Sequence, residues 1–215
     1  MTEKKVQRLS PRLFWGSNMN SNYYYLDDEN LYTYPNTSIL RNKLDVQNLE
    51  KLHLAEHLFV SNRLVQLVEE PIPVMDIKSV RTIHEYLFQD VYTWAGEYRR
   101  VNISKEGKPF MPFQSFHMAE IHISSLISQF KRNNDDITTV SRGLAEILDN
   151  LNYMHPFREG NGRAQREVIR CLALSKNYTL ELNPINNSRV YNAYMQGAVE
   201  SNVVLLTEII VEQLT

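Results

Sequence analysis

The segment from His155 to Arg166, HPFREGNGRAQR, carries residue types that bind phosphate at close spacing. Glycines at the start of a helix let backbone N–H groups approach an anion, and the helix dipole favours the negative charge. Arg163 and Arg166 are three positions apart, so on one helix both guanidinium groups can reach the same anion. The segment therefore predicts a phosphate-binding turn at residues 160–162, followed by a helix.

Two more side chains in this segment could do chemistry. Glu159 offers a hard oxygen ligand of the kind that Mg²⁺ takes when it bridges phosphates. His155 can accept a proton from an attacking hydroxyl, because imidazole titrates near neutral pH. Taken singly, a histidine before Pro156, a Gly-Asn-Gly turn and paired arginines are each common in purely structural roles. Together and in this order they indicate a phosphoryl- or nucleotidyl-transfer site.

Composition narrows the class of protein. The chain has 215 residues, 43% of them hydrophobic and 22% charged, as in ordinary globular domains. A formal net charge of −2 argues against nucleic-acid binding, which needs many basic residues on one face. Cys171 is the single cysteine and cannot form an internal disulfide. No membrane segment or signal peptide is expected, because no apolar run approaches the roughly 18 residues of a spanning helix. We therefore expect a cytoplasmic protein.

The elements that must position these residues are mostly helical. Residues 1–44 are rich in Tyr and Asn without helical periodicity, and we expect an irregular N-terminal arm that packs on the core through its aromatic residues. From residue 45 onwards the pattern is helical, with Asp76, and either Asp135 or Asp136, as N-caps. Leu49, Leu52, Phe59, Leu64 and Leu67 are expected to form the buried stripe of the first helix. Helices are expected at residues 45–70, 77–92, 116–130, 137–153, 162–176, 187–199 and 203–213.

One segment between the helices differs in kind. β-Branched and aromatic residues lie on both sides of Glu106 and Gly107, which indicates a β-hairpin with a glycine at its tip, over about Val101 to Pro112. A simple edge ribbon with no function is the structural alternative for this hairpin. The predicted fold class is all-α, a helical bundle with one β-hairpin.

HPFREGNGRAQR matches throughout the Fic signature, His-x-Phe-x-Asp/Glu-Gly-Asn-Gly-Arg-x-x-Arg, and the chain resembles the Fic family over about residues 45–205. DVYTWAGEYRRVNISKEG is similar to the family segment that leads into a hairpin called the flap. YTYPNTSILRNK, near the N-terminus, resembles the Fic domains of Bartonella type IV secretion effectors. The resemblance implies a Fic-fold helical bundle at residues 45–215, either complete or as the Fic-bearing fragment of a longer effector.

The resemblance also implies an activity, the transfer of AMP from ATP to a Tyr, Thr or Ser hydroxyl of a target protein. His155 would be the base and Glu159 the Mg²⁺ ligand. Phe157 would be buried beneath the loop. The remaining motif residues would bind the phosphates. Gly160, Asn161 and Gly162 would form an anion hole for the α-phosphate. Arg163 and Arg166 would bind the β- and γ-phosphates.

In the family the flap pairs with an extended stretch of the target by strand addition. Lys105 and Glu106 would lie near the phosphates or the target, although many relatives have glycine where Glu106 stands. Relatives that transfer phosphate replace the glycine before the first arginine, so Gly162 favours AMP. Donors of UMP or phosphocholine stay open, as does a non-catalytic nucleotide-binding module.

Regulation and location also follow from the resemblance. Fic enzymes are commonly inhibited by a helix with the pattern Ser/Thr-x-x-x-Glu-Gly/Asn, whose Glu pairs with the second arginine. This chain lacks the pattern, and the nearest segment, TWAGEY, has Tyr98 in the last place. We therefore expect a small antitoxin-like protein to supply the Glu to Arg166. If the chain is part of an effector, a type IV secretion system would deliver it into host cytosol.

Overall fold

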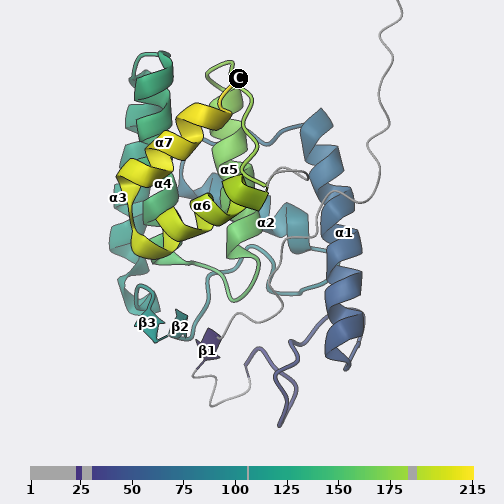
Figure 1. Cartoon of the computed structure of the whole chain (residues 1–215). Helices are drawn as coiled ribbons and strands as arrows, with labels where there is room; N and C mark the ends of the chain where they lie inside the picture. Colours follow the sequence, from purple (N-terminus) through teal and green to yellow (C-terminus); the bar gives the residue numbers. More distant parts are fainter. Residues whose placement is uncertain (1–22, 26–30, 106, 184–187) are drawn as a thin grey trace, which may run out of the picture.

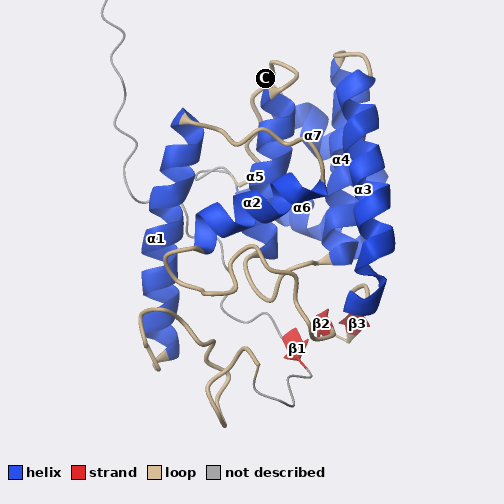
Figure 2. Cartoon of the chain, turned by 180° about the vertical axis from the view of Figure 1, so that it is seen from behind, coloured by secondary structure: helices blue, strands red, loops and turns tan. Residues whose placement is uncertain are grey.

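The computed structural model describes residues 23–25, 31–105, 107–183 and 188–215. It confirms the all-α class with one hairpin (Figures 1 and 2). Among these residues no helix is long and apolar enough to cross a membrane. The helices are α1 (Leu49–Glu69), α2 (Ile77–Phe88), α3 (Phe116–Arg132), α4 (Ile137–Met154), α5 (Asn161–Leu174), α6 (Ser188–Glu200) and α7 (Val203–Gln213).

Side-chain caps start the helices where the sequence predicts them. Asp76 accepts hydrogen bonds from the N–H groups of Lys78 and Ser79 at the start of α2. Asp136 accepts from the N–H of Thr139 at 3.0 Å and so caps α4. Each cap satisfies backbone donors that the first turn leaves without a partner. Asp135, the alternative, instead forms an ion pair with Lys176.

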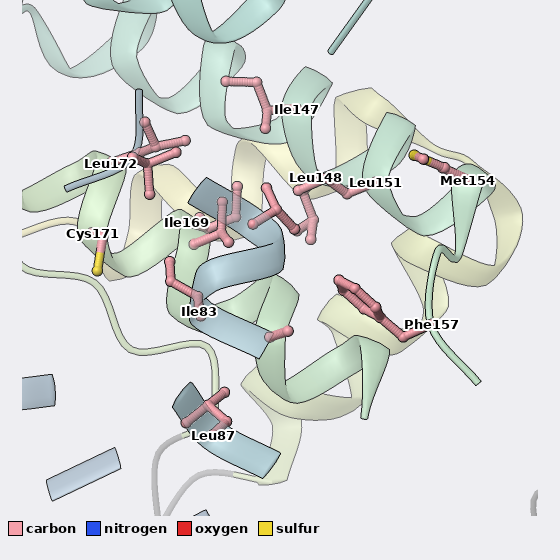
Figure 3. Packing of buried hydrophobic residues seen from close by; sticks show 14 of the residues in the cluster. Ile83, Leu87, Ile147, Leu148, Leu151, Met154, Phe157, Ile169, Cys171 and Leu172 are labelled. Carbon is pink, nitrogen blue, oxygen red and sulfur yellow. The ribbon is translucent and has the colours of Figure 1, made fainter. Parts of the chain in front are cut away.

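The helix α4 packs against α3, α5, α6 and α7, while α2 packs against α5 and α1 packs against α2. Figure 3 shows apolar side chains of α2, α4 and α5 meeting in one core, with Phe157 projecting into it from the loop that follows α4. Ile83, Leu148 and Ile169 are fully buried there. Burial of side chains of this size contributes roughly 1.5–3 kcal/mol each relative to exposure. The core therefore fixes the C-terminus of α4 and the N-terminus of α5, between which residues 155–160 (HPFREG) lie.

The first helix is oriented differently from the prediction. Leu49 and Phe59 are exposed, at 42% and 37%, so their place in the buried stripe was wrong. The buried positions of α1 are Leu52, Glu56, Val60 and Leu67. The reason is that Leu52, Glu56 and Val60, spaced four residues apart, lie on one face of the helix, and Glu56 has partners on the elements packed against that face. The positions of hydrophobic residues alone do not identify the buried face of a helix when that face contains a charged residue.

The hairpin belongs to a small sheet at one end of the bundle (Figure 1). β2 (Ile103–Lys105) pairs antiparallel with β3 (Lys108–Pro109), and Gly107 at the tip has φ +78°. The other edge of β2 pairs antiparallel with β1 (Tyr23–Tyr25), which is not part of the prediction for the arm. Further along the arm, Tyr32 is buried and packs edge-on against Trp94, with ring centroids 5.8 Å apart.

The opposite end of the bundle is closed by backbone pairing. The N–H of Thr179 donates to the carbonyl of Thr215 at 2.7 Å, and the N–H of Thr215 donates back at 3.1 Å. Thr215 thus lies beside the segment that follows α5, on the far side of the bundle from the small sheet (Figure 1).

Candidate active site

The helix α4 ends at His155, whose backbone is left-handed, with φ 44° and ψ 61°. Its ring Nδ1 lies 3.3 Å from the carbonyl oxygen of Asn152. A carbonyl can only accept, so in this arrangement the proton is on Nδ1 and Nε2 is the basic nitrogen. Burial, with smaller contributions from the charges of Arg99 and Lys105, lowers the pKa of His155 to about 3. The imidazole is therefore neutral at physiological pH, as a general base must be.

The loop after His155 is braced by Asn161 and Phe157. The amide of Asn161 accepts from the N–H of Phe157 at 2.9 Å and donates to its carbonyl at 2.8 Å. The ring of Phe157, expected to lie beneath the loop, is 1% exposed. The side chain of Asn161 is occupied by these two hydrogen bonds. Its contribution to anion binding is therefore its backbone N–H, at the N-terminus of α5.

Gly160 occupies a position that only glycine fits. Its φ is +80°, and a Cβ there would lie 2.2 Å from Cζ of Phe88. Gly162 is less crowded, but a Cβ would lie 3.4 Å from Nη1 of Arg166. Gly160 thus lets the backbone pass close to Phe88 as it enters α5, and Gly162 leaves room for the guanidinium of Arg166.

Arg163 lies between two carboxylates from different parts of the chain. Its Nη1 is 2.6 Å from Oε1 of Glu56 on α1, and its Nη2 is 3.5 Å from Oε1 of Glu159. The hydroxyl of Tyr92 donates a short hydrogen bond to the other oxygen of Glu56. Burial opposes the charge of Arg163, yet Glu56 and Glu159 raise its pKa above the ordinary value. The guanidinium is thus kept charged and in place, 4.7 Å above the ring of Phe88.

Arg166 has aromatic neighbours instead. Its Cζ lies 5.7 Å and 5.9 Å from the ring centroids of Tyr191 and Tyr194 on α6. Burial raises the pKa of Tyr194, and the charge of Arg166 works in the opposite direction. Among the described residues no carboxylate lies within 4.0 Å of Arg166. The two motif arginines are therefore held by different means, one by ion pairs and one by rings.

Glu159 is the expected Mg²⁺ ligand, and its surroundings fit that role. The N–H of Gly160 donates to its Oε1 at 2.9 Å, and Arg163 contacts the same oxygen. The side chain is 35% exposed, so the carboxylate is accessible. Within the part of the chain that is described, no group of three His, Cys, Asp or Glu could hold a metal. One carboxylate suits Mg²⁺, which commonly takes few protein ligands together with substrate phosphates.

His84 holds the backbone of Glu159 through a hydrogen bond. Its Nδ1 accepts from the N–H of Gly96 at 2.9 Å, so its Nε2 carries the proton and donates to the Glu159 carbonyl at 2.9 Å. The ring is stacked on Phe157, with centroids 3.7 Å apart. Burial lowers the pKa of His84 to about 3, with a smaller effect from Arg163. A neutral imidazole thus joins the segment before the flap to the catalytic loop.

The flap approaches this site from the other side. The ring of Phe110, just after β3, is stacked on the imidazole of His155, with centroids 3.8 Å apart and planes at 16°. Lys105 at the end of β2 is near enough to influence the pKa of His155. Glu106, the other predicted flap contact, lies outside the described residues.

Sequence reasoning missed Glu56, His84, Tyr92 and Arg99. Glu56 and His84 could have been found as polar residues on otherwise apolar helix faces, between Leu52 and Val60 in one case and next to Ile83 in the other. Tyr92 and Arg99 follow α2 in irregular chain, where periodicity gives no signal.

Comparison with known proteins places the chain in a family. Residues 74–173 match the model of the Fic/DOC family. The chain is 30% identical over 173 residues to the "Probable protein adenylyltransferase Fic" of Escherichia coli K12, covering 78% of this chain and 84% of that protein. The chain therefore belongs to the Fic/DOC family.

A second relative and a solved structure extend the comparison. "Protein adenylyltransferase VbhT" of Bartonella schoenbuchensis is 30% identical over 171 residues, which span 77% of this chain and about a third (35%) of that protein. The crystal structure of BepC, a VirB-translocated effector of Bartonella tribocorum with bound AMPPNP, has a TM-score of 0.74 at 21% identity. That alignment covers 86% of this chain and 97% of the chain in that structure, and with similar matches shows that the fold is that of a Bartonella effector Fic domain.

Proposed function

We propose that this chain transfers AMP from ATP to a Tyr, Thr or Ser hydroxyl of a target protein and releases pyrophosphate. The observation that carries the proposal is the placement of neutral His155 and the glycine-opened N-terminus of α5 at the two ends of one braced loop. The activity named for the E. coli and Bartonella relatives, and the nucleotide analogue bound by BepC, support the same reading.

In this mechanism Nε2 of His155 takes the proton of the target hydroxyl while its oxygen attacks the α-phosphorus. The bond from that phosphorus to the bridging oxygen of the β-phosphate breaks, and pyrophosphate leaves. Backbone N–H groups at residues 160–162 stabilise the charge that develops on the α-phosphate. Arg163 and Arg166 bind the β- and γ-phosphates. Mg²⁺ held by Glu159 would neutralise charge on the phosphates.

The experiment is labelling with ATP that carries ³²P in the α-phosphate. The chain is incubated with bacterial and eukaryotic lysates, and labelled bands are identified by mass spectrometry. His155→Ala is expected to lower labelling by at least about 10³-fold, since it removes the general base. His122→Ala, an exposed histidine of α3, is the matched control and should label normally. Equal labelling by both variants would refute the assignment.

Two alternatives share the motif. A Cβ at position 162 would lie 3.4 Å from Nη1 of Arg166. The resemblance to family members that keep this glycine favours AMP transfer over phosphate transfer. Labelled UTP and CDP-choline, tested beside ATP, separate UMP and phosphocholine transfer from AMP transfer. Tight ATP binding with no turnover on any donor would favour a non-catalytic binding module.

The target is proposed to dock on the flap as an extended strand. β1 pairs antiparallel with one edge of β2, with Tyr24 opposite Ser104, and this pairing supports strand addition at that edge. A target strand would pair there in place of β1, through backbone hydrogen bonds. Crosslinking from a photoreactive residue at Ser104 to the labelled target tests this placement; crosslinks found only from α1 would contradict it.

Regulation is proposed to come from a separate antitoxin-like protein that presents a Glu to Arg166. The aromatic setting of Arg166, with no described carboxylate within 4.0 Å, supports this. Purification from the native host should yield a small partner that is released by Arg166→Ala. Complete inhibition of the lone chain would count against the idea. Delivery by a type IV secretion system, as for the Bartonella effectors, is tested with a translocation reporter.

A further inference from the structure

Arg99 lies where the segment before the flap meets the C-terminus of α4, and it is 1% exposed. Its backbone N–H donates to the carbonyl of Pro156 at 2.8 Å. Its Nε donates to the carbonyl of His155 at 2.8 Å, and its Nη2 to that of Met154 at 3.3 Å. One residue therefore binds three successive carbonyl groups, with the catalytic histidine in the middle.

The same guanidinium also holds both ends of the flap. Nη1 donates to the carbonyl of Val101, before β2, and Nη2 to that of Met111, after β3, each at 2.6 Å. The N–H of Met111 in turn donates to the carbonyl of Tyr153 at 3.0 Å. The Arg99 side chain and the backbone bond from Met111 thus join the base of the flap to the end of α4, beside the stack of Phe110 on His155.

The backbone of His155 needs such contacts. A left-handed conformation is uncommon for a residue other than glycine, and a following proline restricts the residue before it toward extended conformations. Residues in such conformations persist when their surroundings fix them. The bonds from Arg99 to Met154, His155 and Pro156 supply that constraint.

The charge of Arg99 is balanced without an acid. Among the described residues no carboxylate lies within 4.0 Å of it, and its donors are met by carbonyl dipoles at the negative end of α4. Its Cζ lies 4.8 Å from the ring centroid of Phe116. Burial lowers the pKa of Arg99 to about 10, which leaves it charged at neutral pH. The planar fork of donors can reach several carbonyls at once, which a lysine ammonium cannot do.

We propose that Arg99 is a positioning residue, which fixes His155 and the base of the flap relative to each other. A target strand docked on the flap then brings its hydroxyl to the imidazole in register. The second step rests on the proposed AMP transfer, whereas the first concerns only the geometry of the chain.

The test compares Arg99→Lys with Arg81→Lys. Arg81 is the matched control, because its Nε donates to the carbonyl of Gly96 at 2.9 Å and its Cζ lies 4.9 Å from the ring centroid of Tyr98, away from His155. Arg99→Lys is expected to lower kcat for target modification by about 10²-fold, as for a misplaced catalytic group. Its ATP affinity should stay within roughly threefold of wild type, since it leaves the α5 N-terminus intact. Arg81→Lys should change neither.

A readout independent of activity is the Cε1–Hε1 NMR spectrum of the six histidines, with the His155 signal assigned by its loss in His155→Ala. The stacked ring of Phe110 shifts that signal, so a displaced His155 in Arg99→Lys should move it, while Arg81→Lys leaves it in place. An unmoved signal with normal turnover would overturn the proposal. So would equal losses of turnover and ATP affinity with all six signals displaced, because they indicate a general structural role.

Two further outcomes remain decisive. If wild type transfers no AMP, the proposed function fails, and the His155 signal alone decides the role of Arg99. If Arg99→Lys does not fold, Phe116→Leu removes the ring beneath the guanidinium while keeping all its donors. That variant should move the His155 signal and lower turnover by about fivefold, as expected for a lost cation–π contact. No change in either quantity would overturn the proposal.

Discussion

From His155 to Arg166 no residue is exposed, whereas five of the described residues from Val101 to Pro112 are. The loop is held by side chains that bind backbone groups, such as Asn161 and His84, and by the core beneath Phe157. The flap has strands of three and two residues and is anchored mainly at its base, through Arg99. The loop that we propose binds phosphate is therefore preorganised in the free chain. The flap, where we propose that the target docks, has short strands and is more exposed, and the edge of β2 away from β3 is paired with β1.

Two glycines with nearly the same backbone give the sharpest test of this difference. Gly160 has φ +80° and Gly107 has φ +78°, but a Cβ at Gly107 would meet nothing within 4 Å. Gly160→Ala adds a clash with Phe88 to the backbone strain, and should lower the free energy of unfolding by more than about 3 kcal/mol. Gly107→Ala should cost about 1 kcal/mol. Urea unfolding measures both; similar losses would mean that the loop is no more tightly packed than the flap.

The ion pair behind the loop should matter more than an ion pair at the surface. Glu56→Gln weakens a contact with Arg163 in which the side chains are only 8% and 26% exposed. We expect a loss of about 2 kcal/mol in unfolding free energy and weaker ATP binding, because Arg163 loses its stronger partner. Asp90→Asn breaks the more exposed pair with Arg63, and should cost less than about 1 kcal/mol. Calorimetry for ATP and urea unfolding for stability provide the comparison, and a larger loss in Asp90→Asn would reverse it.

Acid should lower the free energy of unfolding through His155 in the loop and His84 packed beneath it. The folded pKa values of His84 and His155 are about 3, below the unfolded value of 6.5, so the unfolded chain binds more protons between these limits. Stability is therefore complete above pH 6.5 and falls as the pH drops toward 3, by about 1.4 kcal/mol per pH unit for each histidine. His155→Ala should reduce the slope of unfolding free energy against pH by the contribution of one proton. The flap variant Gly107→Ala should leave that slope unchanged. A His155→Ala slope equal to that of wild type would contradict the burial argument.

The smallest effect is expected at the flap edge. Deleting residues 1–30 removes β1 from β2 and should raise the rate of target modification a few-fold, because the target no longer competes with the chain's own strand. ATP affinity should not change. Tyr24→Pro is the single-residue version, since proline cannot donate a ladder hydrogen bond. A lower rate in both variants would indicate that β1 helps to hold the flap or the target.

Local signals in the sequence predicted the helices and the glycine turn before α5 well. The Asp76 and Asp136 caps, the periodicity of α4 and α5 and the glycine pattern all act over a few residues, and the structure follows them. The supports of the site did not follow from such signals. Arg99 binds carbonyl groups about 55 residues away, and Glu56 reaches Arg163 from another helix. Partnerships of this kind are set by tertiary packing, which neither propensity nor periodicity describes.

The mutual backbone pairing of Thr179 and Thr215 has a practical consequence. It ties down the last residue at the end of the bundle opposite to the flap (Figure 1). A fluorophore, affinity handle or fused reporter attached after Thr215 would leave the chain far from the β2 edge and from His155. Surface immobilisation through that point would present the flap to solution, which makes it the preferred attachment for capturing a target from a lysate.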